Sequence, residues 1–146
     1  MGRSALKARL GASLLALAVV VGAGACRREV ETEHRGPVEN LTHVTSEPQF
    51  DKLVKTAQTP VLVDLYATWC PPCRKLAPVL DRLAPRYKGR VAFLKVNVDK
   101  VPGLARRFGV RAIPTLLFLK RGKVDDRIVG APREARLRSA LDTLAR

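Results

Sequence analysis

Apolar residues fall along this chain in short runs that alternate with amphipathic stretches, and together these patterns predict one α/β domain. Runs of mostly apolar, often β-branched residues are typical of buried strands. They predict strands at 41–44, 61–67, 91–98, 115–120 and 124–129. Arg121-Gly122 stands between the last two runs, which predicts a hairpin.

Between these runs, apolar positions recur three and four residues apart, which is the spacing of a helix with one buried face. The clearest example comprises Leu76, Val79, Leu80, Leu83, Ala84 and Tyr87. Further helices are expected at 46–57, where Ser46 to Gln49 resembles a capping box, at 102–108 and after Pro132. The order of elements predicts a central sheet of parallel and antiparallel strands with helices on both faces.

The length and charge of the chain limit its organisation and its partners. A chain of 146 residues with 47% hydrophobic content suits one globular domain with appendages, and we expect a monomer. The formal net charge is +14, but the basic residues are scattered singly or in pairs, and aromatic residues make up only 5%. Nucleic acid is therefore not expected as a partner, and the arginines are interpreted as solvated faces.

The first 25 residues have the pattern of a signal peptide. Met1 to Leu10 is basic, and residues 10–25 form an uncharged run of 16 residues rich in Leu, Ala and Val. This run is shorter than the roughly 20 apolar residues of a typical membrane-spanning helix. Export and cleavage are therefore expected, and a permanent signal anchor is the alternative.

Cys26 directly follows Ala23-Gly24-Ala25, whose small residues fit a cleavage site. The arrangement resembles the bacterial lipobox, with Ala23 where leucine is preferred, and it implies that Cys26 is acylated and begins the mature chain. The odd number of cysteines, three, also favours acylation, because a free thiol could exchange with the others. Residues 26–45 are then a lipid-attachment cysteine and a flexible polar tether, and residues 46–146 are the domain. Plain cleavage before Cys26 is the alternative.

Two cysteines stand three residues apart where the strand at 61–67 meets the next helix. Cys70 and Cys73 enclose Pro71 and Pro72, which suit a first helical turn because those positions need no N–H. The unpaired N–H groups and partial positive charge of a helix start favour a thiolate at Cys70. This spacing also allows the Cα separation of about 4.4 to 6.8 Å that a disulfide tolerates. The pair is therefore a candidate redox dithiol, with Cys70 as the more exposed, attacking thiol.

Zinc binding and hydrolysis are the alternative uses of these cysteines. A zinc site needs four ligands, and the chain has no second cysteine pair. The two histidines, His34 and His43, lie in or beside the predicted tether, which also argues against a Cys/His hydrolase. No metal is therefore expected, and no cofactor beyond a Cys70–Cys73 disulfide.

These residues and several others, taken in order, resemble the thioredoxin family. The segment 69–74, Trp-Cys-Pro-Pro-Cys-Arg, is similar to the family's active site, with proline at 71 where cytoplasmic thioredoxins usually have glycine. The other matching features are the strand 63–67, Pro78, the strand 91–99, the segment 109–115, Gly122 and Gly130. The resemblance runs from about Val44 to Arg146 and implies a thioredoxin fold.

Asp64 stands six residues before Cys70 in an otherwise apolar strand, where an unpaired carboxylate is costly and its pKa is expected to rise. The resemblance implies that Asp64 takes and returns the proton of Cys73, with Lys95 as its electrostatic neighbour. A strand-end aspartate that faces solvent is the alternative.

The resemblance also assigns residues to substrate binding. Trp69 would shield the disulfide and contact substrates beside Pro71 and Pro72. Pro114 would lie next to the attacking cysteine in a cis peptide and turn the backbone of Ile113 toward an extended substrate segment. Core packing of Trp69 and a trans turn proline at 114 are the alternatives.

The implied function is that of an extracytoplasmic thiol:disulfide oxidoreductase, held on a membrane through Cys26 and facing the periplasm. It would reduce disulfides of partner proteins and be recharged by an unidentified upstream electron donor. One alternative is a dedicated reductant for cytochrome c maturation or metal-site assembly, although the 41 positions from Cys73 to Pro114 resemble the compact thioredoxin plan. The other is a redox-inactive binding module, against which the intact cysteine pair and Asp64 argue.

Overall fold

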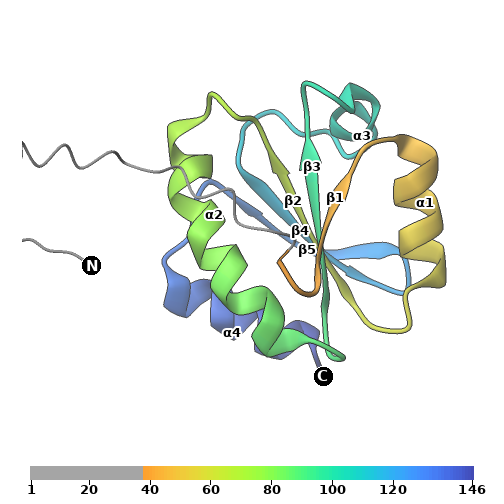
Figure 1. Cartoon of the computed structure of the whole chain (residues 1–146), viewed down its shortest axis with the longest axis vertical. Coiled ribbons are helices and arrows are strands. Elements are labelled where there is room, and N and C mark those ends of the chain that lie inside the picture. Colours follow the sequence, from red (N-terminus) through yellow and green to blue (C-terminus); the bar gives the residue numbers. More distant parts are fainter. Residues whose placement is uncertain (1–37) are drawn as a thin grey trace, which may run out of the picture. The chain divides into compact units, whose positions relative to one another are not determined.

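The computed structural model describes residues 38–146, which form a five-stranded sheet with helices on both faces (Figure 1). The elements in chain order are β1 (Leu41–Val44), α1 (Glu47–Thr56), β2 (Val61–Tyr66), α2 (Pro71–Leu83), the 3-10 helix η1 (Ala84–Tyr87), β3 (Ala92–Asn97), α3 (Pro102–Arg107), β4 (Thr115–Lys120), β5 (Lys123–Val129) and α4 (Glu134–Leu144). The predicted order of strands and helices is confirmed, with η1 as the one addition.

The strand order in the sheet is β1-β3-β2-β4-β5. β1 and β2 run parallel to β3, whereas β4 runs antiparallel to both β2 and β5. The ends of β2 and β3, the start of β4 and the end of β5 therefore lie at the same end of the sheet. β1 is parallel to β3 and also ends there, so five connecting segments leave the sheet at this end, 45–46, 67–70, 98–101, 111–114 and 130–133, and we call it the Cys70 end.

Two apolar cores, one on each face, hold the sheet between its helices (Figure 1). α2 and α4 cover one face, where Leu80 and Leu141 pack with Leu62 and Phe118 of the strands. α1 and α3 cover the other face. Fully burying one such side chain stabilises the fold by about 1.5–3 kcal/mol, so burial on both faces fixes the central strands most firmly.

The folded domain begins earlier than the expected boundary at residue 46. β1 lies in residues assigned to the tether, and it pairs in register with β3 from Leu41 opposite Phe93. The side-chain amide of Asn40 donates to the carbonyl oxygens of Ala84 and Val91, both at 2.8 Å. The predicted signal peptide, Cys26 and the tether up to residue 37 lie outside the described residues. Among residues 38–146, no helix has the length and apolar character needed to cross a membrane.

Two helix ends differ in detail from the sequence prediction. The helix expected to run through Tyr87 ends at Leu83 and tightens into η1, because Pro85 has no N–H to continue the α-helical ladder. Ser46 caps α1 by accepting the Gln49 N–H at 3.3 Å. The return bond of the capping box reaches one residue further than expected, since the Gln49 side-chain oxygen accepts the Thr45 N–H at 2.6 Å.

Candidate functional site

Cys70 and Cys73 form a disulfide at the start of α2, with a Cα–Cα separation of 5.3 Å. Cys70 is the N-cap residue, and Pro71 and Pro72 open the helix without leaving a donor unpaired. The backbone N–H of Cys73 donates to the Cys70 sulfur at 3.3 Å. The same N–H stabilises a Cys70 thiolate once the disulfide is reduced.

The exposure of the two cysteines differs from expectation. Cys70 is 2% exposed and Cys73 is 5% exposed, so Cys70 is not the more accessible residue in the oxidised protein. Both are buried in a small cluster with Ala67, against which Ile113 packs. The feature that distinguishes Cys70 is its N-cap position, where a backbone N–H points at its sulfur.

The segment before β4 brings a cis proline to the disulfide. The Ile113–Pro114 peptide bond is cis, as predicted, which excludes a trans turn proline. The carbonyl oxygen of Ile113 lies 3.7 Å from the sulfur of Cys70. The carbonyl oxygen of Pro114 accepts the N–H of Gly130 at 2.7 Å, which ties this segment to the one that follows β5. The Ile113 backbone thus lies beside Cys70, where the resemblance placed it.

Trp69 projects from the surface beside the disulfide rather than packing in the core. Its side chain is 64% exposed, and its indole N–H donates to the carboxylate of Asp99 at 2.9 Å. The guanidinium of Arg74 donates to the carbonyl oxygen of Thr68 in the same loop at 3.3 Å. The sequence interpretation missed Asp99, although adjacent parallel strands such as β2 and β3 end side by side.

Asp64 lies in the middle of β2 and is only 4% exposed, so the alternative of a solvent-facing aspartate is wrong. Among the described residues, its Oδ1 atom has no hydrogen-bond partner. Burial raises the pKa of Asp64 from 3.8 to about 7, while Lys95 opposes the shift and Asp81 adds to it. The carboxyl group can therefore gain or lose a proton near neutral pH.

Lys95 stands directly opposite Asp64 in the pairing of β2 with β3, as the resemblance implied. It is buried, and its ammonium lies 4.7 Å from the centre of the Tyr66 ring. On the other side of β3, Lys95 stands opposite His43 of β1. Burial and then Lys95 lower the pKa of His43. The three residues form a polar row across the sheet that runs from an exposed histidine to a buried carboxyl, and the sequence interpretation missed its outer member.

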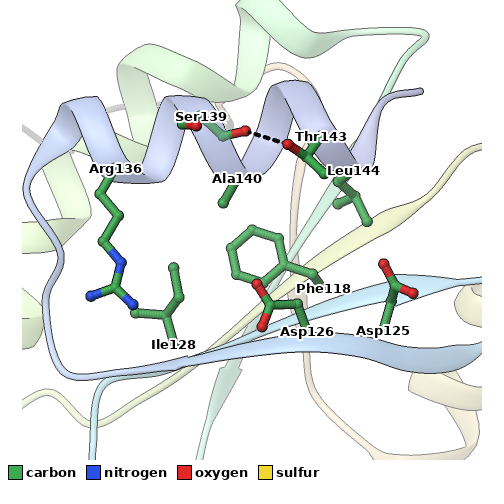
Figure 2. A pocket seen from close by; sticks show the side chains of 9 residues that line it. All are labelled: Phe118, Asp125, Asp126, Ile128, Arg136, Ser139, Ala140, Thr143 and Leu144. Atoms are coloured by element: carbon green, nitrogen blue, oxygen red, sulfur yellow. Dashed lines mark hydrogen bonds between the residues drawn. The ribbon is translucent and has the colours of Figure 1, made fainter.

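A hollow of about 320 Å³ lies between α4 and β5, away from the cysteines (Figure 2). Phe118 and Ile128 form its apolar part, and Asp126 and Arg136 line it from opposite sides (Figure 2). It contains no thiol, so the redox chemistry belongs to the Cys70 end. In the part of the chain that the structure describes, no cluster of three or more His, Cys, Asp or Glu residues is placed to hold a metal.

Asp64→Asn is expected to stabilise the oxidised protein at alkaline pH. Folding raises the pKa of Asp64 from 3.8 to about 7. Between these two pH values the folded protein keeps the Asp64 proton, whereas the unfolded chain releases it. The stability from protonated Asp64 is complete below the lower value and is lost as the pH rises through the higher one. The Asp64→Asn variant has an uncharged side chain at every pH and avoids this loss. Its free energy of unfolding should therefore be roughly 2–4 kcal/mol higher than that of the unmodified protein at about pH 8.

Urea unfolding of both oxidised proteins across the pH range measures this effect. The two unfolding free energies should converge near about pH 4, where the Asp64 carboxyl is neutral in the folded protein. A difference that is the same at every pH would contradict the raised pKa.

Comparison with known proteins finds relatives over the whole folded domain. The family model for thioredoxin matches residues 41–143. The chain is 42% identical over 104 residues to the chloroplastic M-type thioredoxin of Pisum sativum, a match that covers 71% of this chain and 60% of that protein. It is 42% identical over 103 residues to a thioredoxin of Synechocystis sp., covering 70% of this chain and 96% of that protein. The chain spans only 54% to 60% of the length of the chloroplast relatives from pea, maize, rice and spinach.

Solved structures agree with this assignment. The thioredoxin Mala s 13 of Malassezia sympodialis has a TM-score of 0.68 at 32% identity, covering 79% of this chain and 99% of that chain. The thioredoxin NaTrxh of Nicotiana alata has a TM-score of 0.69 at 31% identity, and the match covers 75% of this chain and 96% of that chain. The predicted thioredoxin fold, a mixed sheet flanked by helices, is therefore confirmed. On this sequence identity and this fold, the chain belongs to the thioredoxin family.

Proposed function

We propose that this protein is a thiol:disulfide oxidoreductase that reduces disulfides of partner proteins through Cys70 and Cys73. The observation that carries the proposal is the disulfide at the helix start, with the Ile113 carbonyl 3.7 Å from the Cys70 sulfur. Thioredoxins use their own redox-active disulfide, so the reaction needs no separate cofactor. Family membership supports the reaction class, and the geometry supports the roles that we propose for the individual residues.

The reaction is a pair of exchanges in the reduced protein. The Cys70 thiolate attacks one sulfur of the partner disulfide, which forms a mixed disulfide and releases the other sulfur as a thiolate that takes a proton. Cys73 then loses its proton and attacks the Cys70 sulfur, which releases the partner as a dithiol and restores the Cys70–Cys73 disulfide. Two electrons pass from this protein to its partner, and an upstream dithiol must return them.

Asp64 accepts the proton of Cys73 in the second exchange. Its burial raises the pKa of the carboxyl to about 7, which suits proton transfer at neutral pH. The Oδ1 atom of Asp64 has no hydrogen-bond partner among residues 38–146, so it can receive that proton. Lys95, opposite Asp64 in the sheet, favours the charged carboxylate and so lets the proton leave again.

A general reductant is favoured over a reductant dedicated to cytochrome c maturation or metal-site assembly. Between α2 and the cis proline the chain adds only η1, β3 and α3. Among the described residues, this stretch therefore holds no added helix or strand that would restrict the disulfide to one partner. The exposed Trp69, Pro71 and Pro72 and the backbone of Ile113 are the groups that contact the substrate.

The protein acts outside the cytoplasm, on a membrane that faces the periplasm. The support is in the sequence: a basic start, an uncharged apolar run, small residues before Cys26 and a polar segment after it. One acyl chain binds a membrane only marginally, whereas the several chains of a bacterial lipoprotein anchor it stably. Arg27 and Arg28 add attraction to anionic head groups.

Replacing each cysteine with serine separates the two roles. Cys73→Ser should form a mixed disulfide with a reduction substrate such as insulin and accumulate it, because nothing resolves the intermediate. Cys70→Ser should form little or none. Non-reducing gel electrophoresis and mass spectrometry measure the adduct, and accumulation on Cys73 instead would reverse the assignment.

Asp64→Asn should slow resolution of the mixed disulfide by about 10²-fold at pH 7, since it removes a proton acceptor and keeps the side-chain shape. Rapid-quench kinetics with the reduced protein measure the decay of the adduct directly. Attack by Cys70 is the internal control and should change much less. Unchanged resolution would remove Asp64 from the mechanism.

Cys26→Ser should release a soluble protein, or leave an uncleaved precursor, with the dithiol chemistry unchanged. The intact mass of the mature native protein decides among the alternatives. An acylated chain that begins at Cys26 supports the lipoprotein. An unmodified chain beginning at Cys26 would mean plain secretion, and a retained Met1 would mean a signal anchor.

A further inference from the structure

The Cys70 end of the sheet carries a strong excess of positive charge. The exposed Glu47 at the start of α1 follows segment 45–46, and the other four segments, together with the first turn of α2, hold a single exposed carboxylate, Asp99. Against it stand five exposed cations: Arg74, Lys75, Lys100, Arg111 and Arg133. These residues come from four separate stretches of the sequence, and the parallel and antiparallel pairing of the strands brings them to one end.

The cations at this end are not neutralised by the rest of the domain. Four basic side chains elsewhere in residues 38–146 are ion-paired, Arg82 with Glu134, Lys88 with Glu39, Arg107 with Asp51 and Lys120 with Asp125. Within residues 38–146, none of the five cations of the Cys70 end forms such a pair. Arg74 donates to a neutral carbonyl, and the carboxylate of Asp99 already accepts the Trp69 indole N–H.

Exposed apolar groups lie at the same end of the sheet as these cations. Trp69 is 64% exposed and Val129 is 60% exposed, which is unusual for large apolar side chains, and Pro71 and Pro72, which separate the two cysteines in the chain, are exposed as well. Protein interfaces commonly combine an apolar centre with a polar rim. Here the rim is cationic, and its complement is an anionic rim on the partner.

We propose that the Cys70 end selects protein disulfides flanked by aspartate and glutamate, an inference that names the substrate class and rests on the proposed reductase function. Carboxylates that flank the partner disulfide would face the exposed cations of this end, Arg74, Lys100 and Arg111 among them. Because all of these side chains are exposed, the selection acts mainly on association. It is screened beyond a distance of about 8 Å at physiological salt.

The test uses the full-length chain, chemically reduced, and three disulfide peptides of one length whose residues flanking the cysteines are Glu, Gln or Lys. Each rate constant is divided by that for dithiothreitol, which removes differences in intrinsic disulfide reactivity. At low salt the Glu peptide should be reduced about tenfold faster than the Lys peptide, with the Gln peptide between them. The ratio should fall toward one at about 0.5 M salt.

Matched charge reversals locate the effect. Lys100→Glu with Arg111→Glu should lower the Glu-to-Lys peptide ratio about tenfold. Arg86→Glu with Lys123→Glu makes the same change in net charge at the opposite end of the sheet, and it should lower the ratio less than twofold. Equal loss in both variants would mean that only net charge matters and would overturn the proposal.

The remaining outcomes separate this inference from the function beneath it. Equal reduction of all three peptides by the unmodified protein would overturn the preference and leave the reductase function intact. Failure to reduce any peptide would overturn both. If the peptides show no preference while Lys100→Glu with Arg111→Glu abolishes binding to phosphatidylglycerol vesicles, the cations serve a membrane surface and the proposal is wrong.

Discussion

Burial of β2 on both faces is the constraint on which the rest of the structure depends. Five of its six residues are buried, and it pairs with β3 on one side and β4 on the other. A strand held in this way cannot shift its register without moving its apolar residues out of both cores. Its end therefore fixes Cys70, and the end of β3 fixes Asp99, which accepts the hydrogen bond from Trp69.

Asp64 is the one residue of β2 that opposes this constraint. An apolar residue in its place would add to the core beneath α2, whereas the carboxyl has an unpartnered oxygen and a pKa raised by burial to about 7. The surrounding apolar contacts offset that cost, because they would be lost if the strand moved to expose the carboxyl. The stability of the fold thus maintains a protonatable group behind the disulfide, where a flexible surface residue could not be held.

The sequence predicted those features that depend on local pattern. The strands, the helices, the helix-start disulfide and a raised pKa for Asp64 follow from periodicity, from the effect of proline and from the cost of burying charge. Contacts between distant segments could not be read in this way. The Trp69–Asp99 hydrogen bond, the row from His43 to Asp64 and the pairing of β1 each require knowledge of which strands are neighbours. The relative exposure of the cysteines was wrong because it depends on packing by Ile113, 43 positions from Cys70.

The charge of the protein shows the same difference between sequence order and spatial order. Along the chain the basic residues are dispersed, and that dispersion argues against a nucleic-acid surface. In the fold, two parallel strand ends and an antiparallel hairpin collect cations from four separate segments around one disulfide. Four carboxylates of the described residues are ion-paired with other cations, namely Arg82, Lys88, Arg107 and Lys120. Residues that are dispersed along the chain thereby meet at one end of the sheet, which only the pairing of the strands reveals.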